Sequence, residues 1–349
     1  MASKETSLPG VSFVMPVLNE ADYIENAISS VLAQEYAGKK EVVLALGPST
    51  DGTTEKVLAL AKADPRIRTV ENPKADIPIG LNLAIKASEM PIIVRVDAHS
   101  ELEPGYTAEA VATLQRTGAD NVGGIMHAKG RTAFQATVAR AYNSRFGLGG
   151  AQYHSGSQEG QAESAYLGVF RRSAFEKAGY FDETIRRGED WELNLRIRRG
   201  GGKIWFDPKL KVNYWPRENW PKLVRQFFAT GAWRAELVRR DRGRNPWRFY
   251  APPALVLSII ASITVAILQL TGVLHGKLGL LASTIYAFPA LYVLLLLWVT
   301  LFTDKVRPWS LRPLFLVVLP TMHLSWGTGF IFGLIRGAKG VNDTSRTDD

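Results

Sequence analysis

Three long stretches near the C-terminus contain no Asp, Glu, Lys or Arg, and they restrict what this chain can fold into. They cover residues 251–274, 278–302 and 313–335. Each is long enough to cross a bilayer core of about 30 Å as a helix. Three buried helices of a soluble protein would be the alternative. Because the three runs follow one another directly, we expect three transmembrane helices and a tail at 336–349.

Positive charge gathers just ahead of the first apolar stretch. The net charge is +9, and between Arg217 and Arg248 nine Lys or Arg accompany three acidic residues. Such a cluster beside a membrane span indicates the cytoplasmic side and attraction to anionic lipid. A nucleic-acid-binding patch is the other use of this charge, but the apolar neighbours favour the membrane, so we expect no nucleic-acid partner.

The N-terminus, residues 1–8, is polar and lacks the apolar core of a signal peptide. We therefore expect it to be disordered and the soluble part to lie in the cytoplasm, within a multi-pass protein of the inner membrane. Residues 219–250 link the two parts, and apolar side chains recur there at helical spacing over 219–238. This pattern fits an amphipathic helix on the bilayer or an ordinary helix facing a core, and nearness to the first apolar stretch favours the bilayer.

Strands and helices alternate regularly through the first hundred residues. This alternation predicts an α/β fold with an open parallel sheet and crossover helices. The predicted strands are 11–17, 41–46, 67–70 and 92–96, and the predicted helices are 24–32, 53–63 and 79–88.

Ligands of such sheets bind beyond the C-terminal ends of the strands. Three polar segments fall there, at 16–20, 47–51 and 97–99. Asp97 and His99 are two positions apart at a strand tip, so both side chains point the same way and can reach one ion. A carboxylate and an imidazole suit Mn²⁺ or Mg²⁺ bridging a diphosphate. Alternatively, Asp97 caps a turn and His99 is merely solvated.

Five segments of the chain form a recognisable series. They are Val11 to Glu20 (Val-Ser-Phe-Val-Met-Pro-Val-Leu-Asn-Glu), Ser49 to Thr53 (Ser-Thr-Asp-Gly-Thr), Arg95 to His99 (Arg-Val-Asp-Ala-His), Tyr166 to Asp182, and Gly188 to Glu192 (Gly-Glu-Asp-Trp-Glu). In order and spacing this series resembles family 2 glycosyltransferases with a GT-A fold, over roughly residues 10–240. It is most similar to the ExoA-like branch of exopolysaccharide and succinoglycan synthesis. That branch also has Asp-x-His in place of Asp-x-Asp and a few C-terminal membrane helices.

The resemblance implies a nucleotide-sugar donor, a divalent cation (Mn²⁺ or Mg²⁺) and inversion at the anomeric carbon. Asp97 and His99 would hold the metal and the donor diphosphate. Asp190 would be the base that takes the acceptor proton, with Glu189 as the rival. Alternatively, this acidic pair stabilises a helix N-terminus through the macrodipole.

Donor binding by the first two segments is also implied. Pro16, Val17, Asn19 and Glu20 would line the nucleotide pocket, although Asn19 and Glu20 also suit helix capping. Asp51 would contact the donor or brace its own turn. Many relatives have acidic residues after the second strand, where this chain has Leu46 to Pro48, so a UDP-sugar is only the default donor.

A last motif is altered. Processive synthases carry Gln-x-x-Arg-Trp, whereas here Gln226 is followed at a different spacing by Trp233 and Arg234. These three residues remain candidates for diphosphate or acceptor contacts, but the spacing disfavours processivity.

The sequence thus predicts a GT-A catalytic domain over 9–218, a Rossmann-like open sheet, followed by the juxtamembrane segment and the helical module. The expected activity is sugar transfer to a lipid-linked or polysaccharide acceptor in cell-envelope synthesis. A polyprenyl-phosphate sugar synthase and a non-catalytic nucleotide-sugar-binding scaffold are the alternatives.

Overall fold

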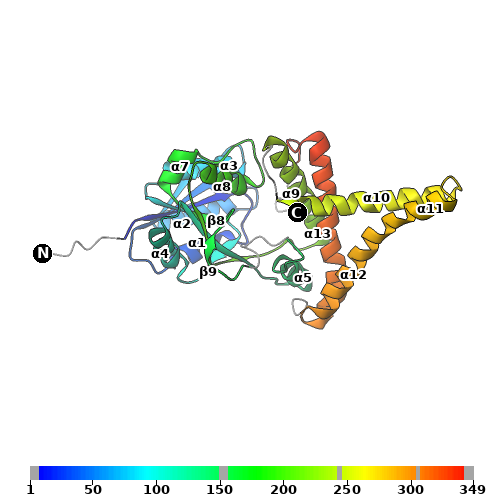
Figure 1. The fold of residues 1–349 in the computed structure, drawn as a ribbon. Helices are drawn as coiled ribbons and strands as arrows, with labels where there is room; N and C mark the ends of the chain where they lie inside the picture. The colour runs from blue at the N-terminus through cyan, green and yellow to red at the C-terminus, as the bar shows by residue number, and fades with distance from the viewer. Residues whose placement is uncertain (1–7, 149–155, 242–245, 304–306, 342–349) are drawn as a thin grey trace. The chain divides into compact units, whose positions relative to one another are not determined.

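The structure is a computed structural model of the chain, and it describes residues 8–148, 156–241, 246–303 and 307–341 (Figure 1). Most of the predicted N-terminal arm and C-terminal tail lies outside these ranges. The chain divides into two compact units. The first contains residues 1–129 and 150–215, and the second contains 130–149 and 216–348.

One mixed sheet forms the centre of the first unit. Strands β1 to β4 are parallel, β8 runs antiparallel to β4 and β6, and β6 is parallel to β9. Their order is β3-β2-β1-β4-β8-β6-β9-β5, with β7 paired to β9. The strands are β1 (Val11–Val17), β2 (Lys40–Leu46), β3 (Ile67–Glu71), β4 (Ile92–Arg95), β5 (Ser100–Leu102), β6 (Asn121–Ala128), β7 (Gly160–Gln161), β8 (Tyr166–Arg171) and β9 (Ile204–Tyr214).

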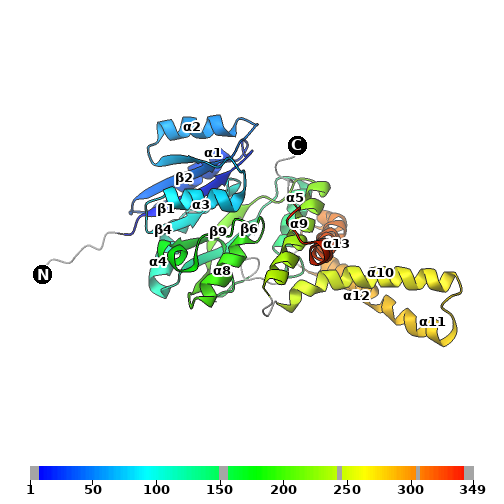
Figure 2. The ribbon, with the colours of Figure 1, turned by 90° about the horizontal axis from the view of Figure 1, so that it is seen from above.

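Helices cover both faces of this sheet (Figure 2). Alternate residues of β1 serve the two cores, since Phe13 and Met15 pack on one face and Val14 on the other. The first core includes side chains of α1 (Ile24–Leu32), α2 (Thr53–Ala63) and α4 (Tyr106–Thr117). The second includes side chains of α3 (Ile77–Ala87), α7 (Arg172–Ala178) and α8 (Glu189–Arg199).

The predicted α/β open sheet is confirmed. The elements of the first hundred residues match their predicted bounds to within about two residues at each end. The sequence did not indicate the antiparallel strands of the second half. Their segments have no regular alternation with helices, so only long-range pairing reveals them.

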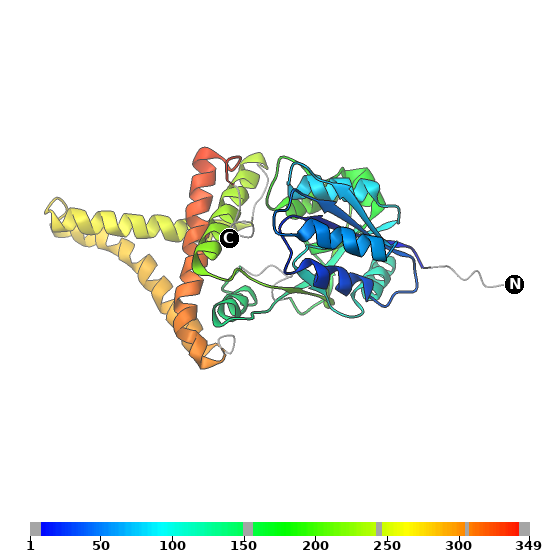
Figure 3. The ribbon, with the colours of Figure 1, turned by 180° about the vertical axis from the view of Figure 1, so that it is seen from behind.

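The second unit is helical (Figure 3). Within the described residues, three segments are long and apolar enough to cross a membrane: Trp247–Leu270, Gly276–Phe302 and Trp309–Arg336. Figure 3 shows α10 and α12 converging on α11. The helices of this unit are α5 (Ala133–Tyr142), α9 (Trp220–Arg240), α10 (Ala251–Leu270), α11 (Gly276–Ala282), α12 (Ala287–Phe302) and α13 (Arg312–Arg336), with short 3₁₀ turns at Trp247–Tyr250, Ser283–Tyr286 and Trp309–Leu311.

Glycine allows α9 and α13 to touch backbone to backbone. A Cβ on Gly231 would lie 2.0 Å from the Trp326 carbonyl oxygen, and one on Gly329 would lie 2.0 Å from that of Phe228. Real Cβ atoms do not approach this closely, so neither position has room for a side chain. The helix over 219–238 is therefore packed against the third apolar helix, which favours the second of its two interpretations.

Helix α5 belongs to this unit although, in the sequence, it falls between two strands of the first unit. Thr132 caps it by accepting a hydrogen bond from the Gln135 N–H at 3.2 Å. The Tyr142 hydroxyl donates to Gln226 Oε1 at 3.1 Å. His323 of α13 bonds the Tyr292 hydroxyl through Nδ1 at 2.9 Å and the Phe146 carbonyl through Nε2 at 2.8 Å. These bonds satisfy polar groups among apolar helices.

Candidate active site

The loops after β1 and β2 are tied together at the C-terminal edge of the sheet. Asn19 has a positive φ of 51°, a conformation that Asn tolerates better than most residues. Its backbone N–H donates to Ser49 Oγ at 3.1 Å, and its side-chain Oδ1 accepts from the Thr50 N–H at 2.9 Å. Asn19 thus links the two predicted donor-binding segments.

The Asp51 side chain stabilises its own turn through hydrogen bonds to backbone N–H groups. Its carboxylate accepts from the Ala21 N–H at 2.9 Å and from the Thr53 N–H at 3.0 Å. Desolvation acts to raise the pKa of Asp51, but these bonds and one from the Thr53 hydroxyl outweigh it and lower the pKa. Donor contact by Asp51 stays a prediction.

Pro16 and Val17 are the last residues of β1. Val17 is 2% exposed and its side chain lies in the core, while its carbonyl accepts from the Gly47 N–H at 2.8 Å. Pro16 is half-buried. Within the nucleotide pocket predicted for this segment, Val17 would therefore contribute backbone more than side chain.

Arg95 joins the tip of β4 to the start of α8. Its guanidinium Nη2 lies 2.9 Å from Glu189 Oε1 and 3.3 Å from Asp97 Oδ1. The side chains of Arg95 and Glu189 are only 7% and 8% exposed. Burial acts to lower the pKa of Arg95, but the charges of Asp97, Glu189 and Asp190 outweigh it and raise that pKa. Arg95 therefore stays charged and compensates a cluster of acids.

Glu189 and Asp190 have different surroundings although they are adjacent. Burial raises the pKa of Glu189, the Arg95 charge opposes that shift, and the charge of Asp190 adds to it. Asp190 is half-buried, and its Oδ1 accepts from the Trp191 N–H at 2.7 Å. Gly188, with a φ of 80°, starts the helix immediately before them. The Arg95 ion pair makes Glu189 the poorer candidate for the base and leaves Asp190 as the better one.

His99 has a carboxylate partner that its sequence position does not indicate. Its Nδ1 lies 2.9 Å from Glu20 Oε1. With an ionised carboxylate as its partner, Nδ1 is the donor of this pair, and in the neutral ring Nε2 is then the nitrogen free to bind a cation. The Tyr214 ring packs edge-on at 6.1 Å between centroids. Glu20 therefore orients His99, a role that neither capping nor nucleotide contact had suggested.

By residue type, Asp97 and His99 could bind a divalent cation carried by a diphosphate, and this role stays a prediction. Among the described residues, no group of three or more His, Cys, Asp or Glu side chains could hold a metal alone. Asp97 and His99 offer one oxygen and one nitrogen. Cations of this kind are held by one or two protein ligands, with phosphate oxygens and water completing the shell.

The candidates of the altered motif lie in the second unit. Trp233 is 2% exposed and its indole N–H donates to the Val341 carbonyl at 2.9 Å. Gln226 is buried and accepts from Tyr142, while the Arg234 guanidinium lies over the Phe249 ring at 4.6 Å. These are packing contacts, and the acceptor or diphosphate role of the three residues stays a prediction.

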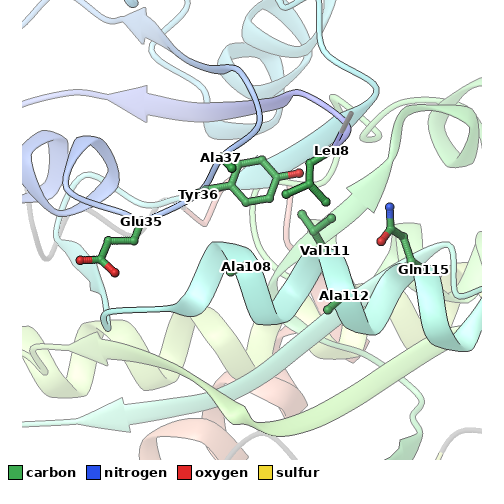
Figure 4. A pocket seen from close by; sticks show the side chains of 8 residues that line it. All are labelled: Leu8, Glu35, Tyr36, Ala37, Ala108, Val111, Ala112 and Gln115. Atoms are coloured by element: carbon green, nitrogen blue, oxygen red, sulfur yellow. The ribbon is translucent and has the colours of Figure 1, made fainter. Parts of the chain in front are cut away.

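A cavity of about 310 Å³ lies elsewhere in the first unit (Figure 4). It is near the start of β1 and the end of α1, whereas the site lies beyond the C-terminal ends of the strands. Its lining has no cluster of chemically active side chains, so we assign it no part in the site. The lining residues are Leu8, Glu35, Tyr36, Ala37, Ala108, Val111, Ala112 and Gln115.

Comparison with known proteins decides the family. The sequence pattern described as "Glycosyl transferase family 2" matches residues 12–179. The succinoglycan biosynthesis protein ExoA of Rhizobium meliloti is 31% identical over 95% of this chain and 96% of its own length. The chain belongs to glycosyl transferase family 2. Both the predicted family and the predicted resemblance to ExoA are confirmed.

Other relatives of this family 2 glycosyltransferase are more distant. A dolichyl N-acetylglucosaminyl phosphate diacetamidodideoxyglucuronosyltransferase of Methanococcus voltae is 24% identical over 78% of this chain and 88% of its own. Among solved structures, a mannosyltransferase of Pyrobaculum calidifontis, in complex with GDP-Man and Mn²⁺, matches with a TM-score of 0.60. It is 20% identical over 91% of this chain and 88% of its own. This likeness confirms the GT-A-like fold.

Proposed function

We propose that the chain transfers a sugar from a nucleotide-sugar donor to a hydroxyl group of a lipid-linked or polysaccharide acceptor, with inversion at the anomeric carbon. The observation that supports it best is the cluster at the tip of β4. There Arg95 contacts both Asp97 of the donor side and Glu189, the neighbour of Asp190. The residues suited to a leaving diphosphate and to a base thus share one edge of the sheet.

In this mechanism the acceptor hydroxyl oxygen attacks the anomeric carbon as the bond from that carbon to the diphosphate breaks. Asp190 accepts the hydroxyl proton, and the nucleoside diphosphate departs from the opposite face. Asp97 and His99 would hold the divalent cation, which when bound neutralises charge on the leaving group. Glu20, 2.9 Å from Nδ1, would orient the His99 ring so that Nε2 can face the cation.

A lipid-linked or membrane-presented acceptor agrees with the second unit. Three helices are suited to crossing a membrane, and the segment before them is basic. By the positive-inside rule this segment would lie on the cytoplasmic side, together with the catalytic unit. The name of the Methanococcus relative describes a sugar carried on dolichyl phosphate, an acceptor of the proposed chemical class.

Glu20→Ala is expected to weaken Mn²⁺ binding in the presence of UDP about 10–100-fold, since the orienting partner of a metal-binding imidazole is lost. Electron paramagnetic resonance of free Mn²⁺ measures this directly. Glu25→Ala is the control, because Glu25 pairs with Lys56 on the surface, where an ion pair contributes little. Unchanged affinity in Glu20→Ala would show that Glu20 does not support a metal ligand.

Donor binding tests the proposed function. The purified full chain in detergent is heated with UDP-, GDP- and dTDP-sugars in the presence of Mn²⁺ or EDTA. One nucleotide class should raise the unfolding midpoint with Mn²⁺ and lose its effect with EDTA. If none of these donors stabilises the chain, the proposed use of a nucleotide sugar is wrong.

A further inference from the structure

The most unusual group of the first unit is the buried guanidinium of Arg95. It is the last residue of β4, and its guanidinium reaches the Asp97 carboxylate two positions later. Besides its two carboxylate partners it faces the Phe181 ring, 5.8 Å from the ring centroid. Burying a charged side chain this deeply lowers the stability of the fold unless opposite charges offset the loss of hydration. We therefore asked what function the buried position of Arg95 serves.

We propose that Arg95 is a positioning residue that fixes the base-bearing end of α8 against the metal-binding end of β4. Its 2.9 Å contact with Glu189 holds the first residue of α8, and Asp190 follows directly. Its 3.3 Å contact with Asp97 holds the other side. One planar guanidinium therefore sets the spacing between the base and the leaving group.

The two contacts of Arg95, with Asp97 and with Glu189, are called the Arg95 clamp below. Repulsion between the carboxylates explains why this clamp is needed. Asp97, Glu189 and Asp190 all act electrostatically on the same guanidinium. Without a cation between them, these acids would drive β4 and the start of α8 apart. Arg95 supplies the compensating charge within the protein, so the spacing exists before any donor arrives. This inference rests on Asp190 being the base of the proposed function.

The Arg95 clamp predicts a different outcome from a role in which Arg95 merely supports metal binding by Asp97. Removing a positive charge beside Asp97 does not weaken attraction of that carboxylate for a cation. Arg95→Met is therefore expected to lower kcat about 100-fold through displacement of the base. The KM for donor should stay within about threefold, and Mn²⁺ affinity in the presence of UDP should be unchanged or tighter. Arg95→Lys, which keeps the charge but not the fork, should fall between wild type and Arg95→Met.

Three further variants distinguish the loss of the Arg95 contacts from a general loss of stability. Glu189→Gln keeps the shape but weakens the ion pair, and its kcat should fall about 10-fold. Combined with Arg95→Met it should add little, because both changes remove one interaction. Arg172→Met is the matched control. That guanidinium donates to the Met90 and Ile85 carbonyls and to Ser88 Oγ, so its loss should reduce stability without this split between kcat and metal affinity.

Steady-state kinetics of the full chain in detergent, with Mn²⁺ binding measured in parallel, decides the matter. A kcat for Arg95→Met within threefold of wild type, or a fall in kcat matched by loss of Mn²⁺ binding, overturns the clamp. If Arg95→Met does not fold, Glu189→Gln decides alone: reduced kcat with normal Mn²⁺ binding supports the clamp, and normal kcat refutes it. An active Asp190→Asn variant would instead refute the proposed base, which keeps the two failures distinct.

Discussion

Asp190→Asn is expected to lower kcat for sugar transfer by about 10²- to 10⁴-fold. The amide has the same shape and its oxygen can still accept from the Trp191 N–H, as Asp190 Oδ1 does at 2.7 Å. It cannot take a proton from the acceptor hydroxyl. Donor binding should change little, because the site residues proposed for the diphosphate are Asp97 and His99. Initial rates and donor affinity of the purified variant measure both effects.

Glu189→Gln is the natural comparison for this variant. Glu189 is buried against Arg95, so its substitution should act through position and cost less activity than that of Asp190. If Asp190→Asn kept full activity, the acceptor would need no base. A phosphate acceptor has that property, and the polyprenyl-phosphate sugar synthase would then be the better account.

Gly329→Leu is expected to destabilise the second unit by about 3 kcal/mol or more, because overpacking an already tight contact forces the helices apart. A Cβ at this position would lie 2.0 Å from the Phe228 carbonyl oxygen. In a lipid environment there is no hydrophobic driving force between helices, and they associate through the close approach of small residues. The thermal unfolding midpoint of the full chain in detergent measures the loss.

Gly340→Ala is the control for this substitution. Its Cβ would meet no heavy atom within 4 Å, so its midpoint should match the wild type. A Gly329→Leu protein that unfolds at the wild-type temperature would mean that α9 and α13 do not pack through their backbones in the membrane-bound protein.

Local pattern was enough to predict the first half of the catalytic unit. Val11–Val17 and Ile24–Leu32 lie at their predicted bounds, because continuous apolar runs and helical spacing are written in neighbouring residues. For the segment that contains α5, no pattern in neighbouring residues indicates which helices it packs against. Its assignment to the helical unit depends on contacts such as Tyr142 with Gln226, which join residues far apart in the chain.

The candidate site likewise has residues that the sequence indicated and pairings that only the structure reveals. Asp97 and His99 could be singled out from their position at a predicted strand end, and Glu189 and Asp190 from the family resemblance, and the roles of all four stay predictions. The pairings of Arg95 with Glu189 and of Glu20 with His99 could not. Each joins elements that only the folded sheet brings together. A partial signal existed for Arg95, since a charged residue inside a strand that is otherwise apolar needs a buried partner.

Sugar transfer itself is the most direct test of the central claim, which is metal-dependent transfer from a nucleotide sugar to a membrane-presented acceptor. Membranes containing the full chain are incubated with radiolabelled nucleotide sugars and Mn²⁺. We predict label in a lipid-extractable or polysaccharide product, and its loss with EDTA and in Asp190→Asn. Wild-type membranes that transfer no sugar from any donor, although the chain is folded and present, would contradict the account.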